Sequence, residues 1–327
     1  MKVIQFTHTD LDGVACAIVA RQYFGRSLKT YFCNYNEVDD TMRTVLGELK
    51  ESGKHCTIII SDLAYSEECT DITFNLLSQH DVIIADHHKS HLWMNDVFGY
   101  KHTCIVDESK FCGAYLLKKI LSSKYSLLNG DSYRLSKFVD YVNQWDTWSW
   151  TNVPKYRESI MKNIPLILAN AHGMLGNKIF IADIEKYLTY QSDNFLSESH
   201  MRKTNAYSNK QVKVVEDVLS KSEFRWVKTD AYGWLKLLFL QDSEHFQSII
   251  SEYSTPLMDD DTSFVMIVEP EYASLRRPVS GIDLSIIARQ FGGGGHPFAA
   301  GGVDFEGNKE NFLTEEQFND IETEKEA

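Results

Sequence analysis

Short apolar runs alternate with helical periodicity along the first half of the chain. Apolar residues fill positions 3–6, 57–60 and 82–85 almost without interruption, as expected of strands that are buried on both faces. Helical periodicity occurs at residues 14–24, 67–77, 113–121 and from Ser132, its predicted N-cap, towards Trp145. Short strands separated by helices are typical of a parallel sheet with helices on both faces. We therefore predict an α/β domain over residues 1–155.

The second half of the chain begins with helical patterns and returns to strand patterns. The predicted helices lie at residues 179–188, 212–219 and 284–291, and the predicted strands at residues 234–240 and 264–268. The first two helices predict a helical connector over residues 156–222. The remaining elements predict a second, smaller α/β domain over residues 223–305.

Charge is distributed unevenly along the chain. The formal net charge of −13 argues against a protein that coats long nucleic acid. Residues 306–327 alone hold eight acidic and two basic side chains, so we predict a mobile acidic tail there that lacks the apolar residues to pack. The rest of the chain is less acidic. A nucleotide substrate therefore remains compatible with the charge, and a short one is favoured over a long backbone.

Composition and length indicate a globular protein of two domains. The 327 residues are 43% hydrophobic and 24% charged, which is typical of folded domains. The chain enters its first strand without a basic and apolar leader, so we predict no secretory signal. No apolar run approaches the roughly 20 residues that span a bilayer. We expect a cytoplasmic protein, in which the six cysteines are reduced thiols.

Polar residues follow the first predicted strand at a regular spacing. His8, Asp10 and Asp12 alternate with other residues and precede Gly13, which allows a turn into a helix. Side chains two positions apart on an extended backbone point the same way. We therefore expect these three side chains to converge. The simpler alternative is that Asp10 caps the helix that follows.

The next two predicted strands also end in ionisable residues. Asp62 follows the apolar run at 57–60, and Asp86, His87 and His88 follow the run at 82–85. Adjacent parallel strands deliver such groups to one edge of a sheet, where open α/β folds bind ligands. A single aspartate at a strand end is usually a cap or a turn residue. The coincidence of three such ends predicts a metal or catalytic site.

A glycine-rich segment forms the second chemical signal. Residues 292–295 are four consecutive glycines, followed by His296 and by Ala299 and Ala300. Glycine backbone amides that are free of side-chain obstruction suit an anion. A flexible loop is the alternative interpretation of such a run.

These motifs resemble those of the DHH phosphoesterase superfamily, which is named for the triplet seen here as Asp86, His87 and His88. That superfamily includes RecJ-type exonucleases, oligoribonucleases, cyclic dinucleotide phosphodiesterases and family II pyrophosphatases. The resemblance assigns the fourth family motif to Asp146, with Asp140 as the alternative. The tryptophans around Asp146 resemble the oligoribonuclease B subgroup in particular. The glycine-rich segment resembles the substrate-binding motif of the DHHA1 domain.

The resemblance implies two divalent cations, with Mn²⁺ favoured and Mg²⁺ as the alternative, and assigns roles to residues in both domains. Asp62 would bridge the cations. The implied metal ligands are His8, Asp10, Asp12, Asp62, His87 and Asp146. His88 would face the substrate phosphate, and Asp86 would orient an imidazole. The implied substrate-binding residues are Ser274, Arg276, Gly293, Gly294, Gly295 and His296, with Arg277 a solvated neighbour.

The implied activity is metal-dependent hydrolysis of short single-stranded oligonucleotides to nucleoside monophosphates. One alternative is a phosphodiesterase or phosphatase for small nucleotides, such as linear or cyclic dinucleotides or 3′,5′-bisphosphorylated adenosine. Another is a catalytically silent module that binds nucleotides. The expected partner is a short oligonucleotide or dinucleotide, with no membrane and no long nucleic acid. The sequence leaves open a homodimer, the polarity of degradation and the choice between RNA and DNA.

Overall fold

The computed structural model divides the chain into two compact units, Met1–Ser208 and Asn209–Ala327. It describes residues 2–99, 103–107, 110–128, 131–190, 193–242 and 244–326. The division falls within the segment that we predicted as a helical connector. The boundaries at residues 155 and 222 stay predictions. Each unit is described by itself below.

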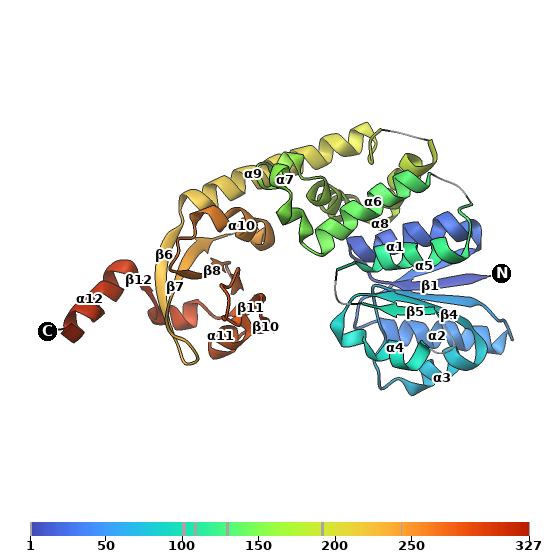
Figure 1. Cartoon of the computed structure of the whole chain (residues 1–327), viewed down its shortest axis with the longest axis horizontal. Helices are drawn as coiled ribbons and strands as arrows, with labels where there is room; N and C mark the ends of the chain where they lie inside the picture. The colour runs from blue at the N-terminus through green and yellow to red at the C-terminus, as the bar shows by residue number, and fades with distance from the viewer. Residues whose placement is uncertain are drawn as a thin grey trace. The chain divides into compact units, whose positions relative to one another are not determined.

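The first unit is built on a five-stranded parallel sheet (Figure 1). Its order is β2-β1-β3-β4-β5, and every neighbouring pair runs parallel. The strands are β1 (Val3–Thr7), β2 (Leu28–Phe32), β3 (Thr57–Ser61), β4 (Asp81–Asp86) and β5 (Thr103–Val106). Strands β1 and β3 are buried along their whole length. The predicted α/β class and the three predicted strands are confirmed.

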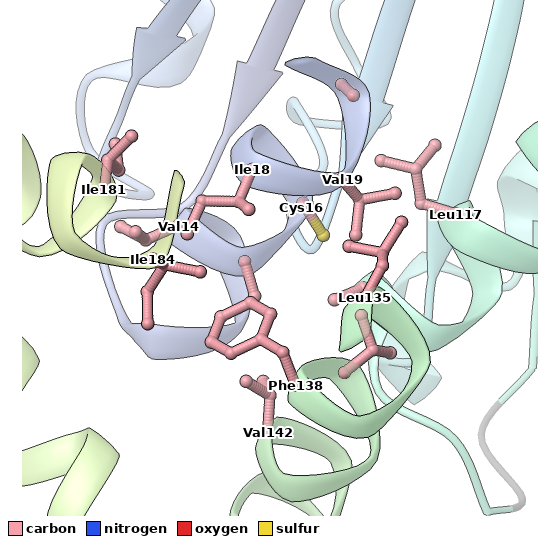
Figure 2. Packing of buried hydrophobic residues seen from close by; sticks show 14 of the residues in the cluster. Val14, Cys16, Ile18, Val19, Leu117, Leu135, Phe138, Val142, Ile181 and Ile184 are labelled. Carbon is pink, nitrogen blue, oxygen red and sulfur yellow. The ribbon is translucent and has the colours of Figure 1, made fainter. Parts of the chain in front are cut away.

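Helices cover both faces of this sheet and form two separate cores. The helices of one face are α1 (Leu11–Phe24), α5 (Gly113–Lys124), α6 (Ser132–Asp146) and α8 (Ile164–Tyr190). Those of the other face are α2 (Val38–Glu51), α3 (Thr70–Gln79) and α4 (Trp93–Phe98). Helix α1 is buried on all sides because α6 and α8 form a further layer over it. Figure 2 shows Phe138 and Val142 of α6 and Ile184 of α8 packing towards Val14 of α1.

Two details of the predicted helices differ in the structure. The N-cap of α6 is Asp131 rather than Ser132, because the Asp131 carboxylate accepts hydrogen bonds from the backbone N–H groups of Tyr133 and Arg134. Helix α3 begins at Thr70, later than predicted. The edge strand β2 and the helix α2 were not predicted. Helix α2 nevertheless carries a clear helical signal, since its buried residues Val38, Met42, Val45, Leu46 and Leu49 repeat every three or four positions.

The helices predicted at residues 179–188 and 212–219 are confirmed as parts of α8 and α9 (Glu198–Ser220).

The second unit is built on a seven-stranded mixed sheet of order β10-β11-β9-β8-β7-β6-β12. Its strands are β6 (Glu223–Thr229), β7 (Gly233–Gln241), β8 (Thr262–Val268), β9 (Ala273–Arg276), β10 (Gly294–His296), β11 (Ala299–Val303) and β12 (Phe312–Thr314). Only the β7–β8 pair is parallel among these strands. Helix α11 (Leu284–Gln290) packs into the core of this sheet, and α10 (Gln247–Tyr253) precedes β8.

The acidic segment at residues 306–327 packs onto the second unit. Strand β12 pairs with β6, and Phe312 is buried opposite Val227. In α12 (Glu315–Glu326), the ring of Phe318 stacks on Trp226 with centroids 4.0 Å apart and planes 6° apart. The prediction that this segment lacks the apolar residues to pack is therefore wrong. Two aromatic residues are sufficient, because each meets an apolar side chain of β6.

No helix among the described residues combines the length and the apolar character that crossing a membrane requires.

We predict that Phe318→Ala lowers the free energy of unfolding of the protein by about 1–3 kcal/mol, because it removes the stack on Trp226 and the edge contact with Trp234. Urea denaturation measures this change. Phe74→Ala is the matched control, since Phe74 is 72% exposed and its loss should stay within about 0.5 kcal/mol. Equal effects of the two substitutions would show that the C-terminal segment contributes no packing energy.

Candidate metal centre

The carboxyl ends of β1, β3 and β4 bring the predicted residues together at one edge of the first sheet. The register aligns the three strand ends, so His8, Asp62 and Asp86 lie next to one another there. A buried hydrogen bond of 3.0 Å from Ser61 Oγ to Thr7 Oγ1 ties the ends of β1 and β3 together. This edge therefore presents its polar side chains from a rigid base.

Eight of the predicted site residues form three overlapping groups at this edge. The groups are His8, Asp10 and Asp62; Asp12, His87 and Asp146; and Asp62, Asp86, His87 and His88. In each group one candidate ligand atom per residue lies within 4.8 Å of the others. His87 Nε2 lies 3.4 Å from Asp62 Oδ1 and 3.3 Å from Asp146 Oδ2. Asp62 and His87 each belong to two groups and so connect the whole site.

The three residues after β1 do not converge on one point. Asp10 is the N-cap of α1 and accepts a hydrogen bond of 2.9 Å from the Gly13 N–H group, with its other carboxylate oxygen 3.0 Å from His8 Nδ1. Asp12 already lies inside α1 and joins a different group. The prediction from extended-strand alternation is wrong for Asp12, because the backbone turns helical after Asp10. The capping role and the site role of Asp10 coexist.

The carboxylate of Asp12 is held by the first turn of α5. It is 1% exposed, and its two oxygens accept hydrogen bonds from the N–H groups of Gly113, at 2.6 Å, and Ala114, at 2.9 Å. A helix N-terminus stabilises such a negative charge. Burial raises the pKa of Asp12, and attraction to His87 offsets this only in part.

Gly113 is a residue of the site that the sequence did not reveal. A Cβ atom there would lie 2.9 Å from Asp62 Cβ and 3.0 Å from Asp12 Oδ2. Glycine is therefore required for the close approach of α5 to both carboxylates. The only sequence signal is a glycine at the start of a predicted helix, which is a common and unspecific feature.

Asp62 and Asp146 each have one carboxylate oxygen whose negative charge is not compensated by a hydrogen-bond donor of the described residues. Asp62 Oδ2 and Asp146 Oδ2 are buried and accept no hydrogen bond from the described residues. Burial, followed by repulsion from Asp12, raises the pKa of both carboxyl groups well above the ordinary value. Asp62 also adopts a left-handed backbone, with φ of 53°. Buried carboxylate oxygens that lack donors, beside imidazole nitrogens, fit the ligand set of a divalent cation.

Asp86 fixes the orientation of two imidazole rings. Its carboxylate accepts hydrogen bonds from the His87 N–H group at 2.7 Å, from His88 Nδ1 at 2.7 Å and from His91 Nδ1. Burial alone would raise the pKa of Asp86, but the hydrogen bonds from His88 and His91 outweigh it and lower the pKa. His91 was not predicted. Its position three residues after His88 is the only signal for it in the sequence.

Tyr35 is a further residue of the site that the sequence did not indicate. Its hydroxyl lies 3.3 Å from His88 Nε2, and its ring centroid lies 4.9 Å from that of His8. Tyr35 follows the unpredicted strand β2, so no sequence pattern connected it with the triplet.

The structure distinguishes the two candidates for the fourth motif. Asp146, at the end of α6, has its Oδ2 atom near His87 as described above. Asp140 is exposed to solvent and belongs to none of the three groups. Trp145 and Trp150 stack beside Asp146, with centroids 6.3 Å apart.

The predicted substrate-binding residues lie in the second unit. Arg276 Nη1 donates hydrogen bonds of 2.9 Å to the carbonyl groups of Leu275 and Ala300, and no described carboxylate pairs with its guanidinium group. Arg277 is not a solvated neighbour as predicted, because it pairs with the buried carboxylate of Glu252. Ser274 is only 2% exposed. Of the two adjacent arginines, Arg276 is thus the one whose charge lacks a partner.

The glycine-rich segment forms a β-hairpin in which Gly294, Gly295 and His296 of β10 pair with β11. The N–H group of Gly293 donates a hydrogen bond of 2.8 Å to the Ala288 carbonyl. The prediction of an amide free for phosphate is therefore wrong for Gly293. A Cβ atom at Gly293 would lie 2.3 Å from the Gly301 carbonyl oxygen, so this glycine permits close approach of two backbones. Within the run of four glycines, a Cβ atom would meet nothing within 4 Å at Gly292 and at Gly294.

Comparison with models of protein families matched none of them. Two curated relatives are similar in sequence. Oligoribonuclease NrnB of Bacillus subtilis is 25% identical over 90% of this chain and 71% of its own length. A 3′,5′-cyclic-nucleotide phosphodiesterase of Helicobacter pylori is 26% identical over 45% of this chain and 44% of its own length.

Two solved structures share the fold at low sequence identity. The pGpG-specific phosphodiesterase PggH from Vibrio cholerae has a TM-score of 0.56 and 12% identity, with 99% of this chain and 97% of that chain covered. Exonuclease RecJ bound to manganese has a TM-score of 0.50 and 13% identity, with 93% and 86% covered. The chain is thus similar in sequence to an oligoribonuclease over most of its length and shares the fold of these two structures, in agreement with the resemblance of its motifs to the DHH phosphoesterase superfamily.

Proposed function

We propose that this protein is a divalent-cation-dependent phosphodiesterase that hydrolyses short single-stranded oligonucleotides and releases nucleoside monophosphates from one end. The observation that carries the proposal is the pair of ligand groups that meet at one sheet edge, one containing Asp62 and the other Asp146, each with an uncompensated buried oxygen. Similarity to an oligoribonuclease over 90% of the chain supports the substrate class. The net charge of −13 favours short substrates over long ones.

Two divalent cations, Mn²⁺ or Mg²⁺, fit the donor set of this edge. The proposed ligands are His8, Asp10, Asp12, Asp62, His87 and Asp146, with Asp62 shared. Carboxylate and imidazole donors without thiolate suit these cations better than structural zinc. When bound, the cations lower the pKa of a water molecule and neutralise the charge that develops on the phosphate.

His88 is proposed to donate a hydrogen bond to a nonbridging phosphate oxygen. Burial lowers its pKa, but the hydrogen bond to Asp86 and the charge of Asp86 raise it overall. When the ring is protonated, Nδ1 donates to Asp86 and Nε2 is the second donor. Asp86 acts as the positioning residue for His88.

Arg276 is proposed to hold a second phosphate of the substrate. A guanidinium group has five N–H donors, and within the described part of the chain only those of Nη1 are bonded, to two carbonyl groups. The remaining donors suit phosphate oxygens, which arginine binds in a planar fork. The open space at Gly294 beside the β10–β11 hairpin is compatible with this role.

A second candidate is a phosphodiesterase for small cyclic or linear dinucleotides. The similarity of 45% of the chain to a cyclic-nucleotide phosphodiesterase favours it. It requires the same cations and the same His88 contact, so only the choice of substrate separates the two candidates.

The function is tested with RNA and DNA oligonucleotides of graded length, labelled at the 5′ or the 3′ end, in the presence of Mn²⁺. We expect mononucleotides to accumulate and the shortest chains to turn over fastest, with a chelator abolishing the reaction. Product ladders resolved over time measure this and show the polarity. Cleavage of cyclic dinucleotides alone would favour the second candidate. Binding without any cleavage would leave only a silent nucleotide-binding module.

Asp146→Asn should lower kcat by about 100-fold or more, because it removes a proposed cation ligand. Asp140→Asn is the matched control on the same helix, and it should leave kcat unchanged because Asp140 is exposed. Circular dichroism of both variants checks that the fold is retained. A larger loss from Asp140→Asn than from Asp146→Asn would contradict the proposed ligand set.

Gly113→Ala should weaken Mn²⁺ binding by about tenfold, because the added Cβ displaces Asp12 and Asp62. Isothermal titration calorimetry with Mn²⁺ measures the affinity without substrate. Gly47→Ala is the matched control, since a Cβ atom there meets nothing within 4 Å in α2, and this substitution should stabilise the helix slightly. Unchanged Mn²⁺ affinity in Gly113→Ala would show that α5 does not position the ligands.

A further inference from the structure

A second cluster of ionisable side chains lies in the second unit, apart from the ligands described above. Glu269 directly follows β8, and His245 lies four residues after the end of β7. Because β7 and β8 are parallel neighbours, both residues emerge at the same edge of the sheet. The Glu269 carboxylate accepts hydrogen bonds from His245 Nδ1, at 2.6 Å, and from Gln247 Nε2.

The pair of His245 and Glu269 is unusual for a purely structural contact. The Glu269 side chain is fully buried, whereas that of His245 is 58% exposed. Burial of a carboxylate is unfavourable unless the group is paired, and its partners here are Gln247 and an imidazole that faces solvent. His245 also adopts a left-handed backbone, with φ of 60°, which is unfavourable for a residue with a Cβ atom. Packing alone requires neither feature.

This cluster is continuous with the face that carries Arg276. Tyr272, Ser274 and Arg276 alternate along the chain and share one face, because Ala273 and Leu275 lie in the core on the other face. The Tyr272 hydroxyl lies 3.4 Å from Gln247 Nε2.

Glu269 is linked to Tyr272 by a backbone hydrogen bond and to Arg276 by electrostatic attraction. Its backbone N–H group donates to the Tyr272 carbonyl at 2.9 Å. Burial lowers the pKa of Arg276, and the negative charge of Glu269 offsets part of that lowering. Glu269 therefore lies within electrostatic range of the guanidinium group.

The net charge of the pair of His245 and Glu269 indicates which group of a nucleotide it can bind. The buried Glu269 carboxylate carries one negative charge, which cancels the single positive charge that a protonated His245 would carry. The pair therefore has no net positive charge to attract a phosphate. With Nδ1–H donated to Glu269, a neutral imidazole presents Nε2 as a hydrogen-bond acceptor. Among the sugar and phosphate groups of a nucleotide, the ribose hydroxyl is the donor that suits such an acceptor, and the 2′-hydroxyl stands on the carbon next to the one that carries the 3′-phosphate.

We propose that His245, held by Glu269, accepts a hydrogen bond from the ribose 2′-hydroxyl of the nucleotide whose phosphate Arg276 binds. The contact makes the second unit selective for RNA over DNA, because the 2′-hydroxyl is the group that distinguishes the two. This inference rests on the proposed function, since it takes the substrate to be an oligonucleotide.

His245→Asn tests the contact. Asparagine tolerates a left-handed backbone but does not extend to the position of Nε2, so the variant removes the acceptor without adding strain. Affinities for RNA and DNA of the same short sequence are measured by fluorescence anisotropy in a chelator, where no cation supports hydrolysis. We expect the dissociation constant for RNA to rise about tenfold and that for DNA to stay constant. Equal weakening of both, no change in either, or a wild-type protein that does not prefer RNA would overturn the inference.

His200→Asn is the matched control. His200 Nδ1 lies 2.6 Å from Oδ2 of the buried Asp183 in the first unit, which repeats the histidine–carboxylate pair away from Arg276. This variant should lower the thermal stability and leave both affinities unchanged. A loss of RNA preference in His200→Asn as well would assign the effect to destabilisation and overturn the inference.

Failure of this inference and failure of the proposed function give different results. If the wild-type protein prefers RNA, and His245→Asn abolishes that preference, while no cation supports cleavage, the ribose contact stands and the proposed hydrolysis fails. If the wild-type protein cleaves oligonucleotides and His245→Asn keeps its preference, the ribose contact fails alone. A wild-type protein that binds neither RNA nor DNA overturns both.

Discussion

Repulsion among five aspartates at one sheet edge is the constraint on which the first unit depends. Asp10, Asp12, Asp62, Asp86 and Asp146 share this edge, and burial adds to the free energy of holding them ionised. Three of them are compensated within the chain: Asp10 by the first turn of α1, Asp12 by the first turn of α5, and Asp86 by His88 and His91. Asp62 and Asp146 keep buried oxygens without donors. The uncompensated charge is therefore concentrated where cations are proposed to bind.

The need to hold these buried aspartates together explains details of the fold that packing alone does not require. Helix α5 must begin close to Asp12, and only glycine at position 113 permits that distance. Asp62 must direct its carboxylate to both ligand groups, and it does so from a left-handed backbone held by a hydrogen bond of 3.0 Å between its N–H group and the Ala85 carbonyl. Strain at Asp62 is tolerated because β3 is the central strand of the sheet and is fully buried.

The sequence predicted the features that depend on a local pattern of residues. It did not predict the features that arise only when distant segments of the chain approach one another. Apolar runs that end in ionisable residues located His8, Asp62 and the triplet, because strand ends in a parallel sheet share an edge. Gly113, His91 and Tyr35 carry no specific local signal, since their roles arise only when α5, the turn after β4 and the turn after β2 meet at the site. The amide of Gly293 was misassigned for a different and local reason: it bonds the Ala288 carbonyl at the end of the preceding helix α11.

Buried glutamates determine which basic side chains of the second unit remain available to bind a ligand. Glu252 pairs with Arg277 and Glu269 pairs with His245, whereas Arg276 donates only to backbone carbonyl groups. The sequence separates the two adjacent arginines only through the family resemblance, and it gives no sign of the partner of Arg277. The carboxylate of α10 separates them: it neutralises Arg277 and leaves the charge of Arg276 to attract an anion. Glu269 accepts the hydrogen bond from His245 Nδ1, so the face combines one site for an anion with the Nε2 atom proposed as an acceptor for a hydroxyl. Every nucleotide carries a phosphate next to a ribose. A face with one site for an anion and one acceptor for a hydroxyl therefore suits a nucleotide better than a face with two free cations would.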